Sequence, residues 1–106
     1  MEPMTIEWAP FRLAEGATES ELLEASAALQ ADFLESQDGF VRRELLRGAG
    51  DQWCDLVYWR DASAAQRAME AAAASHTCTR YFRLMAGAEE AANGVLHFAV
   101  RASYGN

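Results

Sequence analysis

The sequence predicts a single α+β domain over residues 1–106, with the element order βαββαβ. The length allows one domain and little more. Two segments of helical periodicity, each opened by a capping sequence, alternate with four segments rich in β-branched and aromatic residues. Apolar residues make up 51% of the chain and charged residues 24%, a balance typical of a globular domain.

Residues 4–13 mix β-branched and aromatic side chains and favour a strand, in which Pro10 predicts an interruption or a bulge. The following helix begins at Thr18, because Thr18 and Glu21 have capping-box spacing. We expect Gly39 to end this helix in a left-handed conformation. The apolar stripe of the helix comprises Leu22, Leu23, Ser26, Leu29, Phe33 and Leu34.

Residues 40–47 favour an edge strand, because four of the eight side chains are charged. Residues 48–51 predict a hairpin turn into a second strand over residues 52–60. Both alternating sets of side chains in this second strand are largely apolar, so we expect it to be central and covered on both faces. Asp55 interrupts it and needs a buried partner, for which Arg43 on the neighbouring strand is the candidate.

A second capping box at residues 63–66 predicts a helix that runs to about Ser75. This helix is rich in alanine, so it either packs very close to the sheet or leaves a hollow beneath it. Residues 76–85 predict a further helical turn, residues 87–94 a loop, and residues 95–103 the last strand.

Right-handed crossovers place both helices on one face of an antiparallel sheet, which is the ferredoxin-like arrangement. Strands 4–13 and 52–60 then lie inside and the other two lie at the edges. Two helices leave the opposite apolar face uncovered, and a chain of this mass has about 5,900 Å² of surface. We therefore expect a homodimer through the sheet faces, with the 87–94 loop or the chain ends as the alternative cover.

The formal net charge is −7, there is no lysine, and the nine arginines are scattered along the chain. This distribution predicts neither nucleic acid nor an anionic lipid surface as the partner. The sequence also contains no apolar run of the ~18 residues that a membrane span needs. No signal-type apolar stretch follows the first residues, so we expect a cytoplasmic protein.

Two short motifs, Gln-Asp-Gly-Phe at residues 37–40 and Tyr-Trp-Arg-Asp at residues 58–61, suggest a family. With Gly16 and the capped first helix, they make residues 5–102 resemble the antibiotic biosynthesis monooxygenase-like family of dimeric α+β barrels. The resemblance implies a small pocket between helices and sheet in each protomer. For the function, the resemblance implies one of three possibilities: a cofactor-free oxygenase of phenolic substrates, a haem-degrading enzyme, or a protein without an assigned reaction. In a cofactor-free oxygenase of this kind, the substrate itself supplies the electrons.

Haem-degrading members of that family carry an asparagine on the first strand, a tryptophan in the second helix and a histidine after it. Ala9 and Ala68 fall at the first two positions, so only His76 has a counterpart, about two positions out of register. The sequence therefore favours a cofactor-free reading over haem degradation, and we expect no bound metal or cofactor. His76 followed by Cys78 is a fragment of a metal site at most.

His76 is the candidate catalytic base, since a histidine titrates near neutrality, although a helix-end histidine often only interacts with the helix dipole. His97, among apolar residues of the last strand, is a candidate ligand-binding residue or a core or interface histidine. The aromatic candidates for lining a pocket that takes a small apolar or aromatic ligand are Trp8, Tyr58, Trp59, Tyr81 and Phe82. Tyr58 and Trp59 point to opposite faces of a regular strand, so at most one of them lines that pocket.

Two functions remain open from these residues. The first is a cofactor-free monooxygenase acting on an aromatic or polyketide-type molecule, as the resemblance implies. The second is a homodimer that binds a small molecule or serves a structural role without catalysis, because the sequence contains no sharp catalytic constellation. Glu7 and the Asp55–Arg43 pair are interpreted as structural, and Cys54 and Cys78 as small buried thiols.

Overall fold

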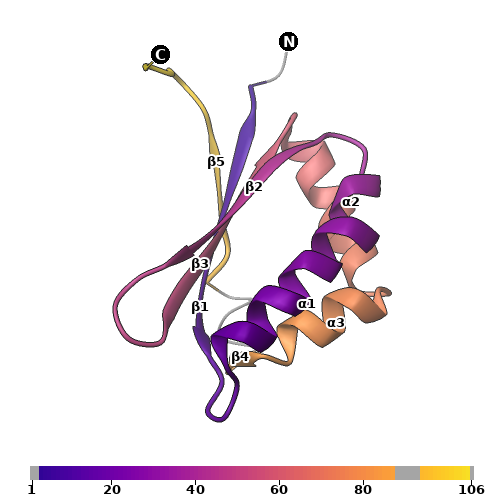
Figure 1. The fold of residues 1–106 in the computed structure, drawn as a ribbon. Helices are drawn as coiled ribbons and strands as arrows, with labels where there is room; N and C mark the ends of the chain where they lie inside the picture. Colours follow the sequence, from indigo (N-terminus) through magenta and orange to yellow (C-terminus); the bar gives the residue numbers. More distant parts are fainter. Residues whose placement is uncertain (1–2, 88–93, 106) are drawn as a thin grey trace.

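The computed structural model describes residues 3–87 and 94–105, and it has the predicted α+β architecture (Figure 1). The elements follow in the order β1 (Thr5–Leu13), α1 (Glu19–Asp32), the 3₁₀ turn η1 (Leu34–Ser36), β2 (Phe40–Arg47), β3 (Gln52–Trp59), α2 (Ala62–Ala72), α3 (His76–Phe82), β4 (Met85–Ala86) and β5 (Leu96–Ala99). The strands form one antiparallel sheet in the order β2-β3-β1-β4, and β5 also pairs with β1. All three helices lie on the same side of it (Figure 1).

The predicted strand positions are confirmed. β1 and β3 are interior strands, and β2 pairs only with β3 among the described residues, which makes it an edge. The final strand is shorter than expected, and α3 forms as a separate helix that begins at His76. The two-residue strand β4 was not expected, and it pairs with Arg12 and Leu13 at the end of β1.

Helix α1 begins as predicted, with both halves of the capping box present between Thr18 and Glu21. Its expected apolar stripe is buried except for Leu23, which is 49% exposed and lies on the outer side of the helix. The helix ends at Asp32 and η1 follows, so Gly39 does not end the helix as expected. Gly39 instead has its left-handed backbone (φ +87°) in the turn that leads into β2.

The predicted start of the second helix is wrong. Asp61 is the N-cap of α2, and its carboxylate accepts a 2.8 Å hydrogen bond from the Ala64 amide. The capping box expected at Ser63 therefore falls inside the first turn. A carboxylate satisfies the free amides of a helix N-terminus and also interacts favourably with the positive end of its dipole.

The interruption predicted at Pro10 is also absent, because β1 pairs with β3 in unbroken register from Thr5 to Arg12. On its other side, β1 pairs with β5 only as far as Trp8 and with β4 only from Arg12. Pro10 lies between those two partners, and the described residues place no strand neighbour there that a missing N–H would leave unsatisfied. The irregularity of the sheet lies in β2 instead, between Phe40 and Arg42.

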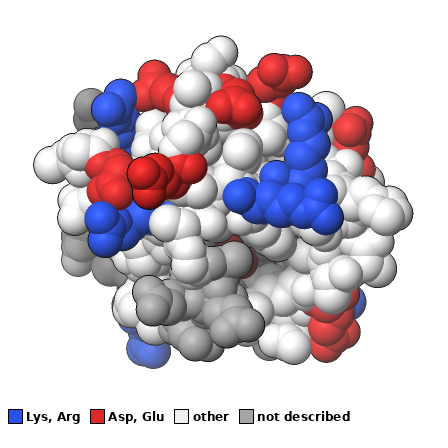
Figure 2. All heavy atoms as spheres, turned by 90° about the horizontal axis from the view of Figure 1, so that it is seen from below, with Lys and Arg blue, Asp and Glu red and all other residues white. Residues whose placement is uncertain are grey.

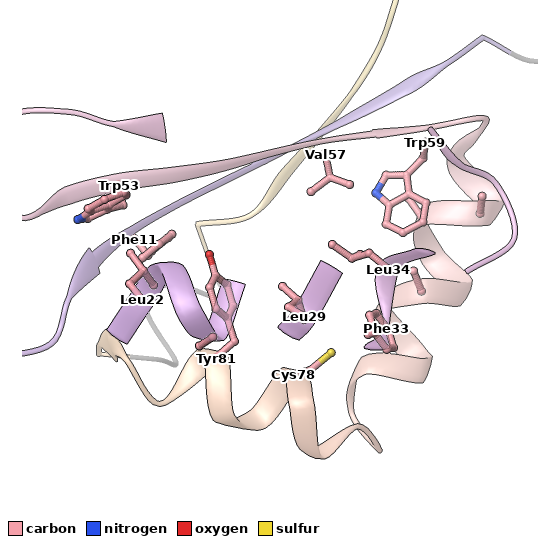
Figure 3. Packing of buried hydrophobic residues seen from close by; sticks show 14 residues of the cluster. Phe11, Leu22, Leu29, Phe33, Leu34, Trp53, Val57, Trp59, Cys78 and Tyr81 are labelled. Carbon is pink, nitrogen blue, oxygen red and sulfur yellow. The ribbon is translucent and has the colours of Figure 1, made fainter. Parts of the chain in front are cut away.

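The register divides the sheet into two different faces. The inner face carries Phe11, Trp53, Val57 and Trp59, which form the core with the helices (Figure 3). The outer face carries the other alternating set, and several of its large apolar side chains are exposed: Leu46 (40%), Trp8 (41%), Leu96 (51%) and Phe98 (52%). Within the described residues, nothing covers this outer face.

Acidic and basic side chains are interspersed on the surface seen in Figure 2, and that face shows no continuous basic stripe. Exposed ion pairs among the described residues include Arg47 with Glu19 and Arg60 with Asp38. None of the helices in the described part of the chain is long and apolar enough to cross a membrane.

The glycine at position 39 generates the first prediction. A Cβ on Gly39 would collide with the Cβ of Ala64, whereas a Cβ on Gly16, also at positive φ, would have free space around it. We expect Gly16→Ala to lower the free energy of unfolding by about 1–2 kcal/mol through backbone strain alone. Gly39→Ala should cost about 1–3 kcal/mol more, because β2 and α2 must separate.

Urea denaturation of the two variants measures this difference. Equal destabilisation of both would contradict the close approach of α2 to the turn before β2.

Candidate functional site

A cavity of about 370 Å³ lies between the inner face of the sheet and the helices. Its lining is predominantly apolar and comes from all three helices and from β1, β2, β3 and β4. The few polar side chains among the described lining residues are Glu7, Arg43, Asp55, Trp59, Cys78 and Tyr81. An apolar chamber with a few convergent polar groups is the usual form of a small-molecule site.

Helix α2 explains how the cavity arises, and both outcomes expected of its alanine-rich sequence occur. Its first turn packs tightly, with Ala64 against Gly39 and Ala65 buried. Its later turns line the cavity through Ala68 and Ala72, whose methyl groups are too short to fill the space above the sheet. The helix therefore both approaches the sheet closely and leaves a hollow.

A buried polar network of three side chains forms part of the cavity wall. Arg43 Nε donates to Asp55 Oδ1 at 2.8 Å, and the Tyr81 hydroxyl donates to Asp55 Oδ2 at 2.6 Å. Arg43 also donates to the Tyr81 oxygen at 3.1 Å and to the Ser26 carbonyl at 3.3 Å. The predicted Asp55–Arg43 pair is thus confirmed, with Tyr81 as a third member that the sequence analysis did not include.

The electrostatics of this network keep the Tyr81 phenol protonated and the Arg43 guanidinium charged. Burial, followed by the nearby Asp55 carboxylate, raises the pKa of Tyr81 far above its usual range, so the phenol stays a donor. Burial alone lowers the pKa of Arg43, but Asp55 and Tyr81 more than offset this, and the pKa is raised overall. Each oxygen of the Asp55 carboxylate therefore already accepts a hydrogen bond from within the protein.

Glu7 is the second carboxylate of the cavity, and its environment is different. It lies on the inner face of β1, opposite Val57 of β3 and His97 of β5. His97 Nε2 is 3.4 Å from Glu7 Oε1, and this is the only ion pair that the described residues give to Glu7. Burial raises the pKa of Glu7, while His97 and the Trp59 indole oppose the rise.

Trp59 carries the unpaired polar atom of the site. Its side chain is 2% exposed, and its indole Nε1–H is buried without a hydrogen-bond partner among the described residues. The indole N–H is close enough to Glu7 to lower that pKa, but it does not reach hydrogen-bond geometry. A buried donor without a partner costs free energy, so this donor is available to a ligand oxygen.

The structure brings together three of the predicted site residues. Trp59, Tyr81 and Phe82 line the cavity, and the Tyr81 hydroxyl points from α3 toward the sheet (Figure 3). His97 lies next to Glu7 on the inner face but is not itself in the lining. Phe82, at the end of α3, is 42% exposed.

The other predicted site residues lie elsewhere. Trp8 and Tyr58 belong to the outer face of the sheet. Of the neighbours Tyr58 and Trp59, which point to opposite faces, Trp59 is therefore the one that lines the cavity. His76 is the exposed first residue of α3 and does not line the cavity.

Sequence reasoning missed the position of Glu7 in the site. The signal that identifies it is the alternation of side chains along a strand, which places Glu7, Ala9 and Phe11 on the same face of β1. The expected slip at Pro10 hid this signal, since a shift of one residue exchanges the two faces.

The cysteines show no sign of reactivity. Cys78 lines the cavity and Cys54 is buried in β3, and burial raises the pKa of both thiols. Within residues 3–87 and 94–105, no group of three histidine, cysteine or acidic side chains is close enough to hold a metal ion.

Solved structures share this fold over nearly its whole length. SnoaB, a cofactor-independent oxygenase from Streptomyces nogalater, superposes with a TM-score of 0.69 at 23% identity, covering 97% of each chain. A protein of Chloroflexus aurantiacus, provisionally assigned as an antibiotic biosynthesis monooxygenase, has a TM-score of 0.65 at 11% identity, covering 96% of this chain and 97% of its own.

A variant of MhuD crystallised with two manganese protoporphyrin IX molecules per active site has a TM-score of 0.66 at 24% identity, covering 98% of this chain and all of its own. No protein-family model matches the sequence, and no curated protein matches it. The solved structures therefore confirm the predicted resemblance at the level of the fold.

The second prediction concerns the buried network. Tyr81→Phe removes one donor to Asp55 and leaves Oδ2 unpaired in the core, so we expect a loss of about 1–3 kcal/mol in the free energy of unfolding. Tyr58→Phe is the matched control, because its hydroxyl makes only a 3.3 Å contact with exposed Glu44 on the outer face.

That control should change stability by no more than about 0.5 kcal/mol. Guanidinium denaturation of both variants measures the two effects, and a Tyr81→Phe protein as stable as the Tyr58→Phe protein would contradict the network.

Proposed function

We propose that this protein is a cofactor-free monooxygenase-type enzyme that takes a small aromatic or polyketide-type molecule into the cavity between its helices and sheet. The observation that carries the proposal is the cavity itself, which is apolar apart from a few polar groups of the sheet and α3. The unpaired Trp59 N–H supplies a donor for an oxygen of a flat ligand. The fold of SnoaB, a cofactor-independent oxygenase, supports the same reading.

The reaction implied by this proposal draws its electrons from the substrate. For an anthrone-type substrate, the ring methylene is oxidised to a carbonyl, and O₂ is reduced to that carbonyl oxygen and one water. The protein's contribution is orientation, exclusion of water and stabilisation of the ionised phenol or enol that reacts with O₂. Phe82 and Tyr81 supply apolar contact at the side of α3, and Trp59 supplies the donor at the sheet.

We also propose that the protein acts as a homodimer through the outer face of its sheet. The exposed side chains of Trp8, Leu96 and Phe98 alternate with those of the inner face on neighbouring strands and form a continuous apolar surface. Large apolar patches of this kind are rare on monomeric proteins, and a second copy covers such a patch symmetrically.

The third prediction tests the dimer. Phe98→Arg places a charge in the proposed interface, so the variant should sediment as a monomer where the wild type sediments as a dimer. Leu23→Arg makes the same change at a similarly exposed position on α1 and should remain dimeric. A wild type that sediments as a folded monomer at micromolar concentration would refute the interface.

The fourth prediction tests the activity. Purified protein incubated with an anthrone or a quinol should consume O₂ above the buffer rate, and Trp59→Phe should lower that rate by about tenfold through the loss of one hydrogen bond in the transition state. His76→Ala tests the base predicted from the sequence, which lies outside the cavity lining. Wild-type rates equal to buffer across a panel of such substrates would refute the oxygenase.

The second candidate function is a homodimer that binds an apolar ligand without transforming it, and the pairing of Asp55 favours it, since both oxygens of this carboxylate already accept hydrogen bonds from Arg43 and Tyr81. Ligand-induced thermal stabilisation without O₂ uptake would support this alternative. Titration with haemin belongs in the same experiment, and an absorption band that vanishes in His76→Ala would support haem binding instead.

A further inference from the structure

Glu7 and Trp59 present a complementary pair of polar atoms to the cavity. Glu7 faces Val57 across the sheet, and Trp59 is the next residue but one along β3 on the same inner face, so the two side chains are diagonal neighbours. The indole nitrogen lies on the side of the Trp59 ring that faces Val57 (Figure 3). The buried indole N–H is a donor without a partner, and the Glu7 carboxylate is an acceptor that no cavity donor saturates.

A single hydroxyl group satisfies both atoms at once. Its oxygen accepts from the indole N–H, and its hydrogen is donated to the carboxylate. A carbonyl satisfies only Trp59, and an amine or another donor satisfies only Glu7. The pair thus selects a ligand that carries a hydroxyl at the sheet side of the cavity.

We propose that Glu7 is the proton acceptor for a phenol or enol hydroxyl of the bound molecule, with Trp59 Nε1–H holding the oxygen of that hydroxyl. The proposal rests on the function proposed above and names the group that ionises its substrate. In this step the O–H bond of the ligand breaks and an O–H bond forms on the Glu7 carboxylate. The electron pair stays on the ligand oxygen, where the indole N–H stabilises the charge.

His97 is the positioning residue for Glu7. It lies opposite Glu7 on β5, with its Nε2 3.4 Å from the carboxylate, and it is partly open to solvent on the other side. The remaining titratable groups at the cavity are Asp55 on β3, Arg43 on β2, and Cys78 and Tyr81 on α3. Asp55, Arg43 and Tyr81 are bound to one another, and the buried Cys78 thiol remains protonated. His97 and the Trp59 indole lower the pKa of Glu7, and Asp55 adds to the rise that burial causes.

The environment of Glu7 suits this role. Burial raises the pKa of Glu7 above its usual value, which makes the carboxylate a stronger base, while His97 and the Trp59 indole oppose the rise. Proton transfer is most effective when the base has a pKa near the working pH. An exposed glutamate is a weaker base than one held in this way.

The experiment uses two probes under anaerobic conditions, 4-nitrophenol and its methyl ether 4-nitroanisole. The ether keeps the oxygen acceptor and lacks only the hydroxyl proton. Wild-type protein should bind the phenol about tenfold more tightly than the ether, which is the value of one good hydrogen bond. Glu7→Gln should bring the ratio close to one without weakening ether binding, whereas Trp59→Phe should weaken both probes.

Two controls separate this role from a structural one. Glu44→Gln makes the same chemical change on the outer face and should leave the preference intact. The preference of the wild type should decline as the pH falls through the raised pKa of Glu7, because the protonated side chain no longer accepts as a carboxylate. His97→Gln should move that decline to higher pH, since the opposing charge is lost.

Glu7→Gln with an unchanged preference, or wild-type protein that does not bind 4-nitrophenol, overturns the assignment of Glu7. The assignment of Glu7 and the proposed function can be refuted independently of each other, by two different outcomes. A preference that depends on Glu7 in a protein that consumes no O₂ refutes the oxygenase and keeps the hydroxyl site. O₂ uptake that survives in Glu7→Gln at the wild-type rate and pH profile refutes the base and keeps the oxygenase.

Discussion

The interaction on which the site depends is the buried contact of Asp55 with Arg43 and Tyr81. It joins β2, β3 and α3 through side chains that are all nearly inaccessible to solvent. A buried ion pair of this kind contributes little net stability when complete, but removing one partner costs about 3–5 kcal/mol because a charge is left uncompensated. The network therefore fixes where α3 sits above the sheet, and α3 in turn forms one wall of the cavity.

The sheet has two apolar faces, and the three helices cover only one of them. The inner face receives α1, α2 and α3, and alanine in α2 leaves an opening that larger side chains would have filled. The outer face has Trp8, Leu96 and Phe98 exposed over β1 and β5. Because strand side chains alternate, one register determines both which residues line the cavity and which are free to meet a second copy.

Much of the fold followed from local chemistry in the sequence. The capping box at Thr18, the charged edge strand and the hairpin into an apolar central strand all depend on neighbouring residues, and all are confirmed. The Asp55–Arg43 pair was also predictable, because a hairpin brings the two strands into contact. The errors arose where a competing local solution existed, as with Asp61 in place of Ser63 as a cap.

The candidate site was harder to predict, because it depends on long-range register. No local pattern indicates that Tyr81 reaches Asp55, 26 positions away in the sequence, or that β5 sets His97 opposite Glu7. The gap between β4 and β5 accommodates Pro10 without a slip, and this gap is a property of the assembled sheet. Pro10, which predicts a bulge from the sequence, therefore does not disturb the register that places Glu7 in the cavity.

Asp55 and Glu7 lie on the same face of the sheet, but their carboxylates have different surroundings. Asp55 accepts from a guanidinium and a phenol, so its oxygens are occupied by the protein itself. Glu7 has the 3.4 Å contact with His97, and burial raises its pKa against the opposing effects of His97 and the Trp59 indole. Environments that separate two acids in this way assign them different roles. Asp55 organises the wall of the cavity, and Glu7 is the carboxylate that remains free to receive a proton from what the cavity holds.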